Sequence, residues 1–89
     1  MKLYVYTFVS EDKDKEIVEN EVFLNFFEAT NRLMESYKTC LINMQITEDE
    51  DSGYTHNIDI NSQHCRACVS DDITGETCVW TINIVDVVL

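Results

Sequence analysis

Cysteine and histidine side chains offer this chain its clearest route to metal or nucleophile chemistry. Cys65 and Cys68 form a Cys-x2-Cys pair, His64 precedes them, and Cys78 follows further along the chain. Thiolates and imidazoles in such a set are the usual ligands of a structural zinc ion. A zinc-binding pair needs a tight turn, but "CRAC" contains no Gly or Pro, and a strand points its two thiols to opposite faces. We therefore expect reduced cysteines, Cys40 among them, that pack as small apolar groups, with a zinc site as a minor alternative.

The same side chains could also form a nucleophilic pair, in which His56 or His64 activates one of the three thiols Cys65, Cys68 and Cys78. Such a pair needs an oxyanion hole and a group that orients the base, and nothing in the sequence supplies either. The carboxylates lie among polar neighbours, where they stay ionised and solvated rather than tuned for acid–base work. We expect a protein without enzymatic activity and without a cofactor.

Four consecutive acids before Gly53 invite a test for a calcium loop. Aligning Gly53 with the glycine of an EF-hand places Glu48, Glu50 and Ser52 at the first three ligand positions. Asp59 then falls at the last position, where a bidentate Glu is usual, and the residues that follow the run predict a strand instead of a second helix. The run is therefore interpreted as a solvated loop.

Acidic side chains gather in three clusters and dominate the charge of the chain. Seventeen acidic residues face six basic ones, which gives a net charge of −11. The clusters are Glu11, Asp12, Asp14, Glu16, Glu19 and Glu21; Glu48, Asp49, Glu50 and Asp51; and Asp71, Asp72 and Glu76. This charge repels nucleic acid and anionic membranes, and it attracts the basic grooves with which proteins bind nucleic acid. A partner with a basic surface is the favoured hypothesis, and simple hydration of the loops is the alternative.

Alternating apolar residues predict the strands that must position these clusters. Residues 2–10 are apolar on both faces, which predicts a strand inside the sheet. Residues 11–21 predict a loop or hairpin tip, with a short return strand over 17–23. "YTHNIDI" predicts a third strand, and "SDDITGE" predicts a turn between two more. A loop over 72–75 gives these last strands a register in which every facing pair is apolar: Val69 with Cys78, Ala67 with Trp80, and Cys65 with Ile82.

Asn25 marks the start of the one predicted helix. Glu28 follows three residues later, as in a capping box, and apolar residues then recur at helical spacing over 26–43. Glu28 and Arg32 have the spacing of an ion pair on the outer face of that helix. These elements predict an α+β fold, an antiparallel sheet of four to five strands with one helix packed on one face. Their order is strand, return strand, helix, and then three strands.

The length of 89 residues and a hydrophobic content of 45% fit a single domain, residues 1–89. The apolar run over 3–9 is followed by charge instead of a cleavage site, so it predicts a strand and not a signal peptide. We therefore expect a cytoplasmic protein. One helix cannot cover both faces of such a sheet, so a homodimer formed through the uncovered face is the second functional hypothesis.

In outline the chain resembles small acidic proteins encoded by bacteriophages and gut-bacterial mobile elements. The shared features are "KLYVYTF", the acidic connector "SEDKDKEIVENE", "VFLNFFEA" before the helix, and the terminal hairpin "CRACVSDDITGETCVWTINIV". Some small acidic phage proteins, including several anti-CRISPR inhibitors, mimic DNA and block a nuclease complex. The resemblance implies a non-enzymatic anti-defence inhibitor that occupies a nucleic-acid-binding surface by DNA mimicry.

Overall fold

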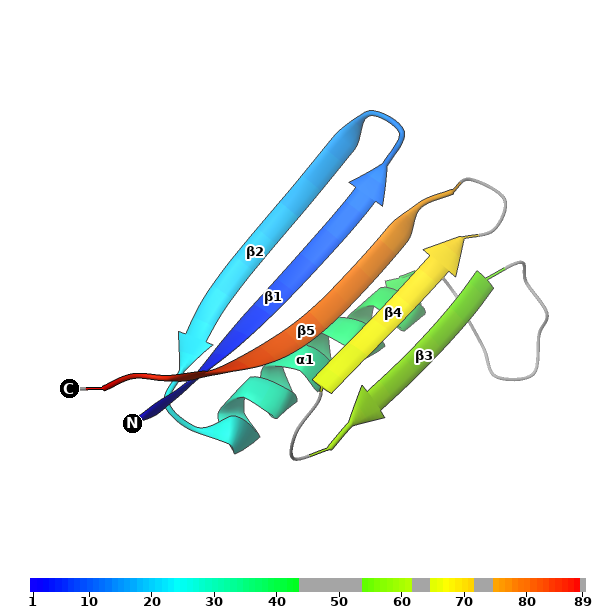
Figure 1. Ribbon diagram of the computed structural model, residues 1–89. Helices are drawn as coiled ribbons and strands as arrows, with labels where there is room; N and C mark the ends of the chain where they lie inside the picture. Colours follow the sequence, from blue (N-terminus) through cyan, green and yellow to red (C-terminus); the bar gives the residue numbers. More distant parts are fainter. Residues whose placement is uncertain (44–53, 62–64, 72–74, 89) are drawn as a thin grey trace.

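An antiparallel sheet of five strands carries one helix against one of its faces (Figure 1). The computed structural model describes residues 1–43, 54–61, 65–71 and 75–88. The predicted α+β class is confirmed, and so is the predicted span of the helix. Along the chain the elements are β1 (Lys2–Asp12), β2 (Lys15–Phe23), α1 (Phe26–Asn43), β3 (Tyr54–Ile60), β4 (Cys65–Asp71) and β5 (Thr77–Asp86).

The strands lie side by side in the order β2-β1-β5-β4-β3. The last strand of the chain therefore occupies the middle of the sheet, and β1 has a neighbour on each side, as its two apolar faces predict. The predicted pairing of the last two strands is confirmed residue by residue. Val69 lies opposite Cys78, Ala67 opposite Trp80, and Cys65 opposite Ile82.

The first two strands are longer than predicted, and they form a hairpin. β1 continues to Asp12 and β2 begins at Lys15, so most of the stretch expected to be a loop is paired backbone. Every residue from 11 to 22 is exposed. Because this part of the hairpin buries neither face, its strands need no apolar alternation, and a charged strand at the edge of a sheet is well tolerated.

The Asn25 side chain caps α1 as predicted. Its Oδ1 accepts hydrogen bonds from the backbone N–H groups of Phe27, at 2.7 Å, and Glu28, at 3.4 Å. These bonds satisfy two amides that have no partner inside the helix.

Among the described residues, no helix combines the length and the apolar character that crossing a membrane requires. The helix buries three residues spaced four apart, Ala29, Leu33 and Tyr37.

Trp80 lies at the centre of the core between the sheet and α1, and it is fully buried. The ring of Phe8 stacks against it with centroids 5.1 Å apart, and the ring of Tyr37 meets it edge-on at 5.6 Å. Its indole N–H donates a 2.8 Å hydrogen bond to Ser36 Oγ on the helix. This one side chain therefore joins β1, β5 and α1 through both apolar and polar contacts.

Candidate functional site

One end of the sheet brings together the strand ends that border the acidic clusters (Figure 1). One row of paired residues crosses all five strands at this end. In the order of the strands from β2 to β3, its members are Glu16, Glu11, Thr77, Ser70 and Thr55. The turn between β1 and β2, the end of β4 and the start of β3 therefore share this end. We call it the acidic end. Its described acids are Glu11, Asp12, Asp14, Glu16, Asp71 and Glu76.

Two residues of the third predicted cluster, Asp71 and Glu76, lie at the acidic end. Asp71 and Glu76 are half-buried, and the Asp71 amide donates a 2.8 Å hydrogen bond to the Glu76 carbonyl. Asp71 also pairs with Tyr54, the first residue of β3. Glu48, Asp49, Glu50, Asp51 and Asp72 lie outside the described residues.

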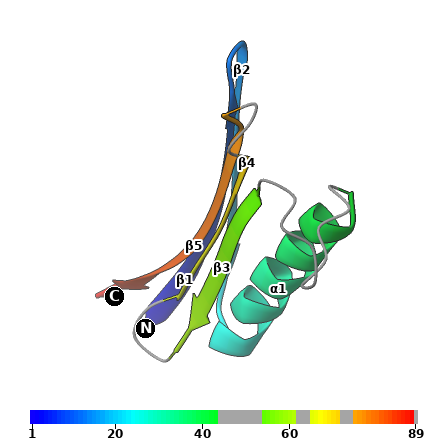
Figure 2. The ribbon, with the colours of Figure 1, turned by 90° about the vertical axis from the view of Figure 1, so that its right-hand side faces the viewer.

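The tip of the β1–β2 hairpin extends beyond the end of α1, as Figure 2 shows. Glu16 and Glu11 face each other across the strands on the side of the sheet away from the helix. Like charges in this arrangement repel, which costs the hairpin a few tenths of a kcal/mol. Asp12 and Lys15, the next pair toward the tip, are of opposite charge. The hairpin is thus folded despite an acidic pair that a cation would stabilise.

Glu21 differs from the other hairpin acids because it already has a cationic partner. Its Oε2 accepts a 3.1 Å hydrogen bond from Arg32 Nε on α1, and the Arg32 guanidinium lies 5.1 Å from the centre of the Tyr6 ring. Arg32 therefore pairs with a residue of β2 and not with Glu28 as its helical spacing predicts. Both side chains of the pair are about half exposed, so the bond contributes little to stability.

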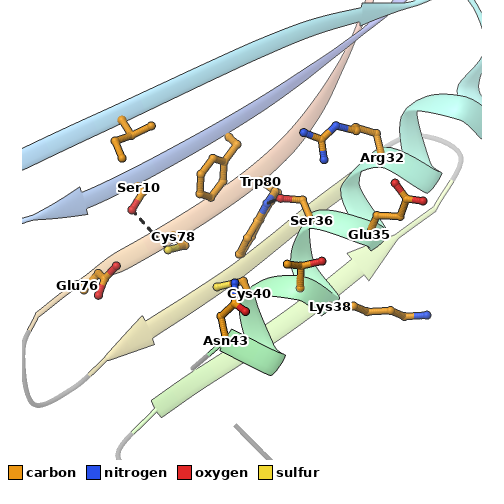
Figure 3. A pocket seen from close by; sticks show the side chains of 13 residues that line it. Ser10, Arg32, Glu35, Ser36, Lys38, Cys40, Asn43, Glu76, Cys78 and Trp80 are labelled. Atoms are coloured by element: carbon orange, nitrogen blue, oxygen red, sulfur yellow. Dashed lines mark hydrogen bonds between the residues drawn. The ribbon is translucent and has the colours of Figure 1, made fainter. Parts of the chain in front are cut away.

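A groove of about 770 Å³ lies between α1 and strands β1, β2 and β5 (Figure 3). Its floor includes Trp80 and Phe8, and Ser10, Cys40 and Cys78 line the part that lies toward the acidic end. The groove forms because α1 covers the middle of the sheet, while the β1–β2 hairpin continues past it. Ligand sites in proteins are commonly clefts of this size with an apolar floor and a few polar groups.

Cys40 and Cys78 form a thiol pair inside this groove. The Cys40 and Cys78 side chains share a hydrogen bond, and the Cys78 thiol donates a 3.7 Å hydrogen bond to Ser10 Oγ. The bond with Cys40 lowers the pKa of the Cys78 thiol to about 7 against the opposing effect of burial, and Ser10 acts in the same direction. The same bond, together with burial, raises the pKa of the Cys40 thiol. Cys78 is therefore the more acidic thiol of the pair.

The cysteines proposed for zinc are spread over both faces of the sheet. Cys65 is buried on the helix side, where its thiol donates a 3.3 Å hydrogen bond to the Asn61 carbonyl. Cys68 lies on the other side of the same strand, opposite Val79. In the part of the chain that the structure describes, no group of three metal-ligating side chains comes together, and His64 lies outside that part.

His56 lies in the same row of the sheet as Cys78, with Val69 between them on β4. Its Nδ1 is 3.2 Å from the Tyr37 hydroxyl, and the two groups share a hydrogen bond. Asp59, the last position of the calcium alignment, lies in β3 opposite Arg66, so the strand predicted after the acidic run is confirmed.

Comparisons of the chain with protein-family models, with curated proteins and with solved structures found no match. The resemblance in outline to small acidic phage proteins stays a prediction. Function is therefore inferred from the acidic end of the sheet and from the groove beside α1.

Proposed function

We propose that this protein is a non-enzymatic inhibitor or adaptor that places its acidic end against a basic, nucleic-acid-binding surface of a partner protein. The observation that supports this best is the β1–β2 hairpin, which extends past the helix and exposes all of its acids (Figure 2). In its sharpest form the proposal is an anti-defence inhibitor that keeps DNA out of a nuclease complex. The acids concerned are Glu11, Asp12, Asp14, Glu16, Glu19 and Glu21.

The charge density of the hairpin indicates which nucleic acid it would replace. Residues 15–21 extend over about 24 Å at about 3.4 Å per residue. The six acids of both strands and the turn, counted along that length, give about one carboxylate per 4 Å. This spacing is close to the ~3.4 Å per charge of one DNA strand and much wider than the ~1.7 Å of a duplex. Lys13 and Lys15 reduce the net charge of the segment to −4, six acids less two lysines. We therefore expect the hairpin to occupy the path of a single strand.

The Glu11–Glu16 pair gives the interaction a source of affinity. The two carboxylates repel each other in the free protein because they lie directly opposite on adjacent strands. An arginine or lysine of the partner placed between them would relieve this repulsion and form charge-assisted hydrogen bonds. The hairpin is held in place by β5, which pairs with β1 over its whole length up to Glu11, so little ordering entropy is lost on binding.

Two charge-matched variants test the proposal. The hairpin variant carries Glu11→Gln, Asp14→Asn, Glu16→Gln and Glu19→Gln, and the control carries Glu28→Gln, Glu35→Gln, Asp59→Asn and Asp86→Asn. Each neutralises four exposed acids and changes the net charge from −11 to −7. Immobilised wild-type protein would capture partners from a nuclease-treated bacterial lysate, and each purified partner would be titrated against both variants at several salt concentrations.

We expect the hairpin variant to bind at least tenfold more weakly, with a reduced salt dependence, and the control to bind nearly as the wild type does. Fluorescent single-stranded DNA bound to the partner should be displaced by the wild-type protein. Equal binding by both variants, or simultaneous binding of the protein and DNA to the partner, would contradict the proposal.

An apolar row on the uncovered face favours a homodimer as the second candidate. Val18, Val9, Val79 and Cys68 lie opposite one another across four neighbouring strands, and Val18 is 51% exposed. Such a row suits an isologous contact between two copies. Light scattering at high protein concentration would detect the dimer, and Val9→Thr together with Val79→Thr should abolish it. A monomer at every concentration would exclude this candidate.

A further inference from the structure

The groove beside α1 brings together two thiols that are far apart in the sequence. Cys40 lies in the last turns of α1 and Cys78 near the start of β5, and both side chains point into the groove (Figure 3). Both residues line a groove of about 770 Å³, in which Cys40 is half-buried and Cys78 is 3% exposed. The groove is therefore the route by which a small oxidant would reach the pair.

The hydrogen bond between the two thiols sets up an order of reaction. The shared hydrogen bond lowers the pKa of Cys78 and raises that of Cys40, so Cys78 loses its proton more readily than Cys40. Thiolates, and not thiols, attack oxidants and disulfides. Cys78 is thus the group that reacts first, and Cys40 is the neighbouring thiol that can resolve the product.

We propose that Cys40 and Cys78 form a reversible redox site, at which a peroxide joins them in a disulfide that ties α1 to β5. The Cys78 thiolate attacks one oxygen of hydrogen peroxide, the O–O bond breaks, and hydroxide leaves as Cys78 becomes a sulfenic acid. The Cys40 sulfur then attacks the Cys78 sulfur, the S–O bond breaks, and the Cys40 proton leaves with that oxygen as water. Two thiols lose two electrons, peroxide gains them, and a dithiol reductant reverses the change.

The other two cysteines are internal controls for this chemistry. Cys65 is as buried as Cys78, at 3% exposed each, but its thiol donates a hydrogen bond to the Asn61 carbonyl, and burial raises its pKa. Cys68 is half-buried on the opposite side of the sheet from the groove. Neither lines the groove, so peroxide should spare both while it oxidises the pair.

Spacing of glutamates in the sequence makes the product easy to map. Cleavage after Glu places Cys40 in the peptide 36–48, Cys78 in 77–89, and both remaining cysteines in 51–76. The full-length protein would be treated with hydrogen peroxide at pH 7.5, its free thiols blocked with N-ethylmaleimide, and the digest analysed by mass spectrometry. We expect a linked peptide of 36–48 with 77–89, which dithiothreitol separates.

Variants separate the two roles. Cys40→Ala should stop at the sulfenic acid, which dimedone traps on the peptide 77–89, while Cys78→Ala should give no adduct on 36–48. Cys68→Ala should form the disulfide as the wild type does. Linkage should also raise the Tm on the order of 10 °C, because it closes a long loop that contains β3 and β4.

A digest of oxidised wild-type protein without the 36–48 to 77–89 link would overturn the proposal, whatever the variants do. So would equal modification of the peptide 51–76. Fluorescence of Trp80, which lies in the same groove, would verify that each variant is folded before it is oxidised.

Discussion

The helix-covered middle of the sheet and the β1–β2 hairpin share strand β1 but differ sharply in burial. Beneath α1, Tyr6, Trp80 and Leu33 are at most 1% exposed. Along the hairpin, every residue from 11 to 22 is exposed on both sides, including Ile17 at 50% and Val18 at 51%. β1 belongs to both regions, since Tyr6 lies in the core and Glu11 lies in the hairpin.

The contrast indicates how a small protein can separate stability from recognition. Burial of apolar area gives the middle of the sheet its stability, and the hairpin contributes little to it. The hairpin can therefore carry repelling acids, because its backbone pairing is anchored by β5. Substitutions should have large effects on folding in one region and small effects in the other, which the following measurements can test.

The largest contrast is expected between core and hairpin truncations. Leu33→Ala should lower the free energy of unfolding by about 2–5 kcal/mol, because it leaves a cavity in a fully buried site. Val18→Ala in the hairpin should lower it by about 0.5 kcal/mol or less. Urea unfolding followed by Trp80 fluorescence measures both, and similar losses would show that the hairpin is part of the cooperative core.

The thiol pair, where the two regions meet, should show a pH-dependent reactivity. Iodoacetamide should modify Cys78 slowly below its pKa of about 7, where the thiol is protonated, and faster as the pH rises through that value. Cys40→Ala removes the hydrogen bond that lowers this pKa, so the midpoint should move to higher pH. Rates from the peptide 77–89 give both midpoints, and identical midpoints would refute the assigned cause.

Removal of the hydroxyl of Tyr6 and removal of that of Tyr37 should have different effects on the free energy of unfolding. The Tyr6 hydroxyl is buried, and within the part of the chain that the structure describes it has no hydrogen-bond partner. Tyr6→Phe should therefore leave the free energy of unfolding unchanged or raise it by about 1 kcal/mol. Tyr37→Phe should lower it by about 1 kcal/mol, because its hydroxyl shares a hydrogen bond with His56. Thermal unfolding measures both, and a loss with Tyr6→Phe would indicate a partner in the folded protein.

The smallest effects are expected within the hairpin itself. Glu11→Gln removes the repulsion with Glu16 and should raise stability by a few tenths of a kcal/mol. Glu21→Gln breaks the bond with Arg32 and should lower stability by less than about 1 kcal/mol. Both differences should shrink in high salt, since salt screens exposed charges. If all hairpin acids were equivalent, both substitutions would change the stability in the same direction, which would contradict this prediction.

The local sequence pattern predicted the helix, the strands and the β4–β5 register, but it did not predict the order of the strands in the sheet. The β4–β5 register follows from alternation and turn residues, so Ala67 and Trp80 were correctly paired. Alternation of apolar and polar residues predicts which face of the sheet a residue lies on, but it does not predict which strands are neighbours. The central position of β5 was therefore not predicted.

Two contacts of α1 were missed for the same reason. Cys40 belongs to the apolar stripe of the helix and Cys78 to the core face of its strand, and combining the two would have placed both thiols in one layer. The missing information was where α1 crosses the sheet. The same uncertainty concealed the bond between Arg32 and Glu21.

The position of β2 at the margin of the sheet has a consequence for self-assembly. An edge strand offers its outer N–H and C=O groups to any other strand, and Ile17, Val18 and Val22 would add apolar contacts to such an addition. Glu16, Glu19 and Glu21 lie between and beside these residues along β2 and act as gatekeepers against fibril growth. Acidification that neutralises them should therefore favour ordered aggregation through β2, so the acids that we propose for recognition also keep the hairpin from pairing with copies of itself.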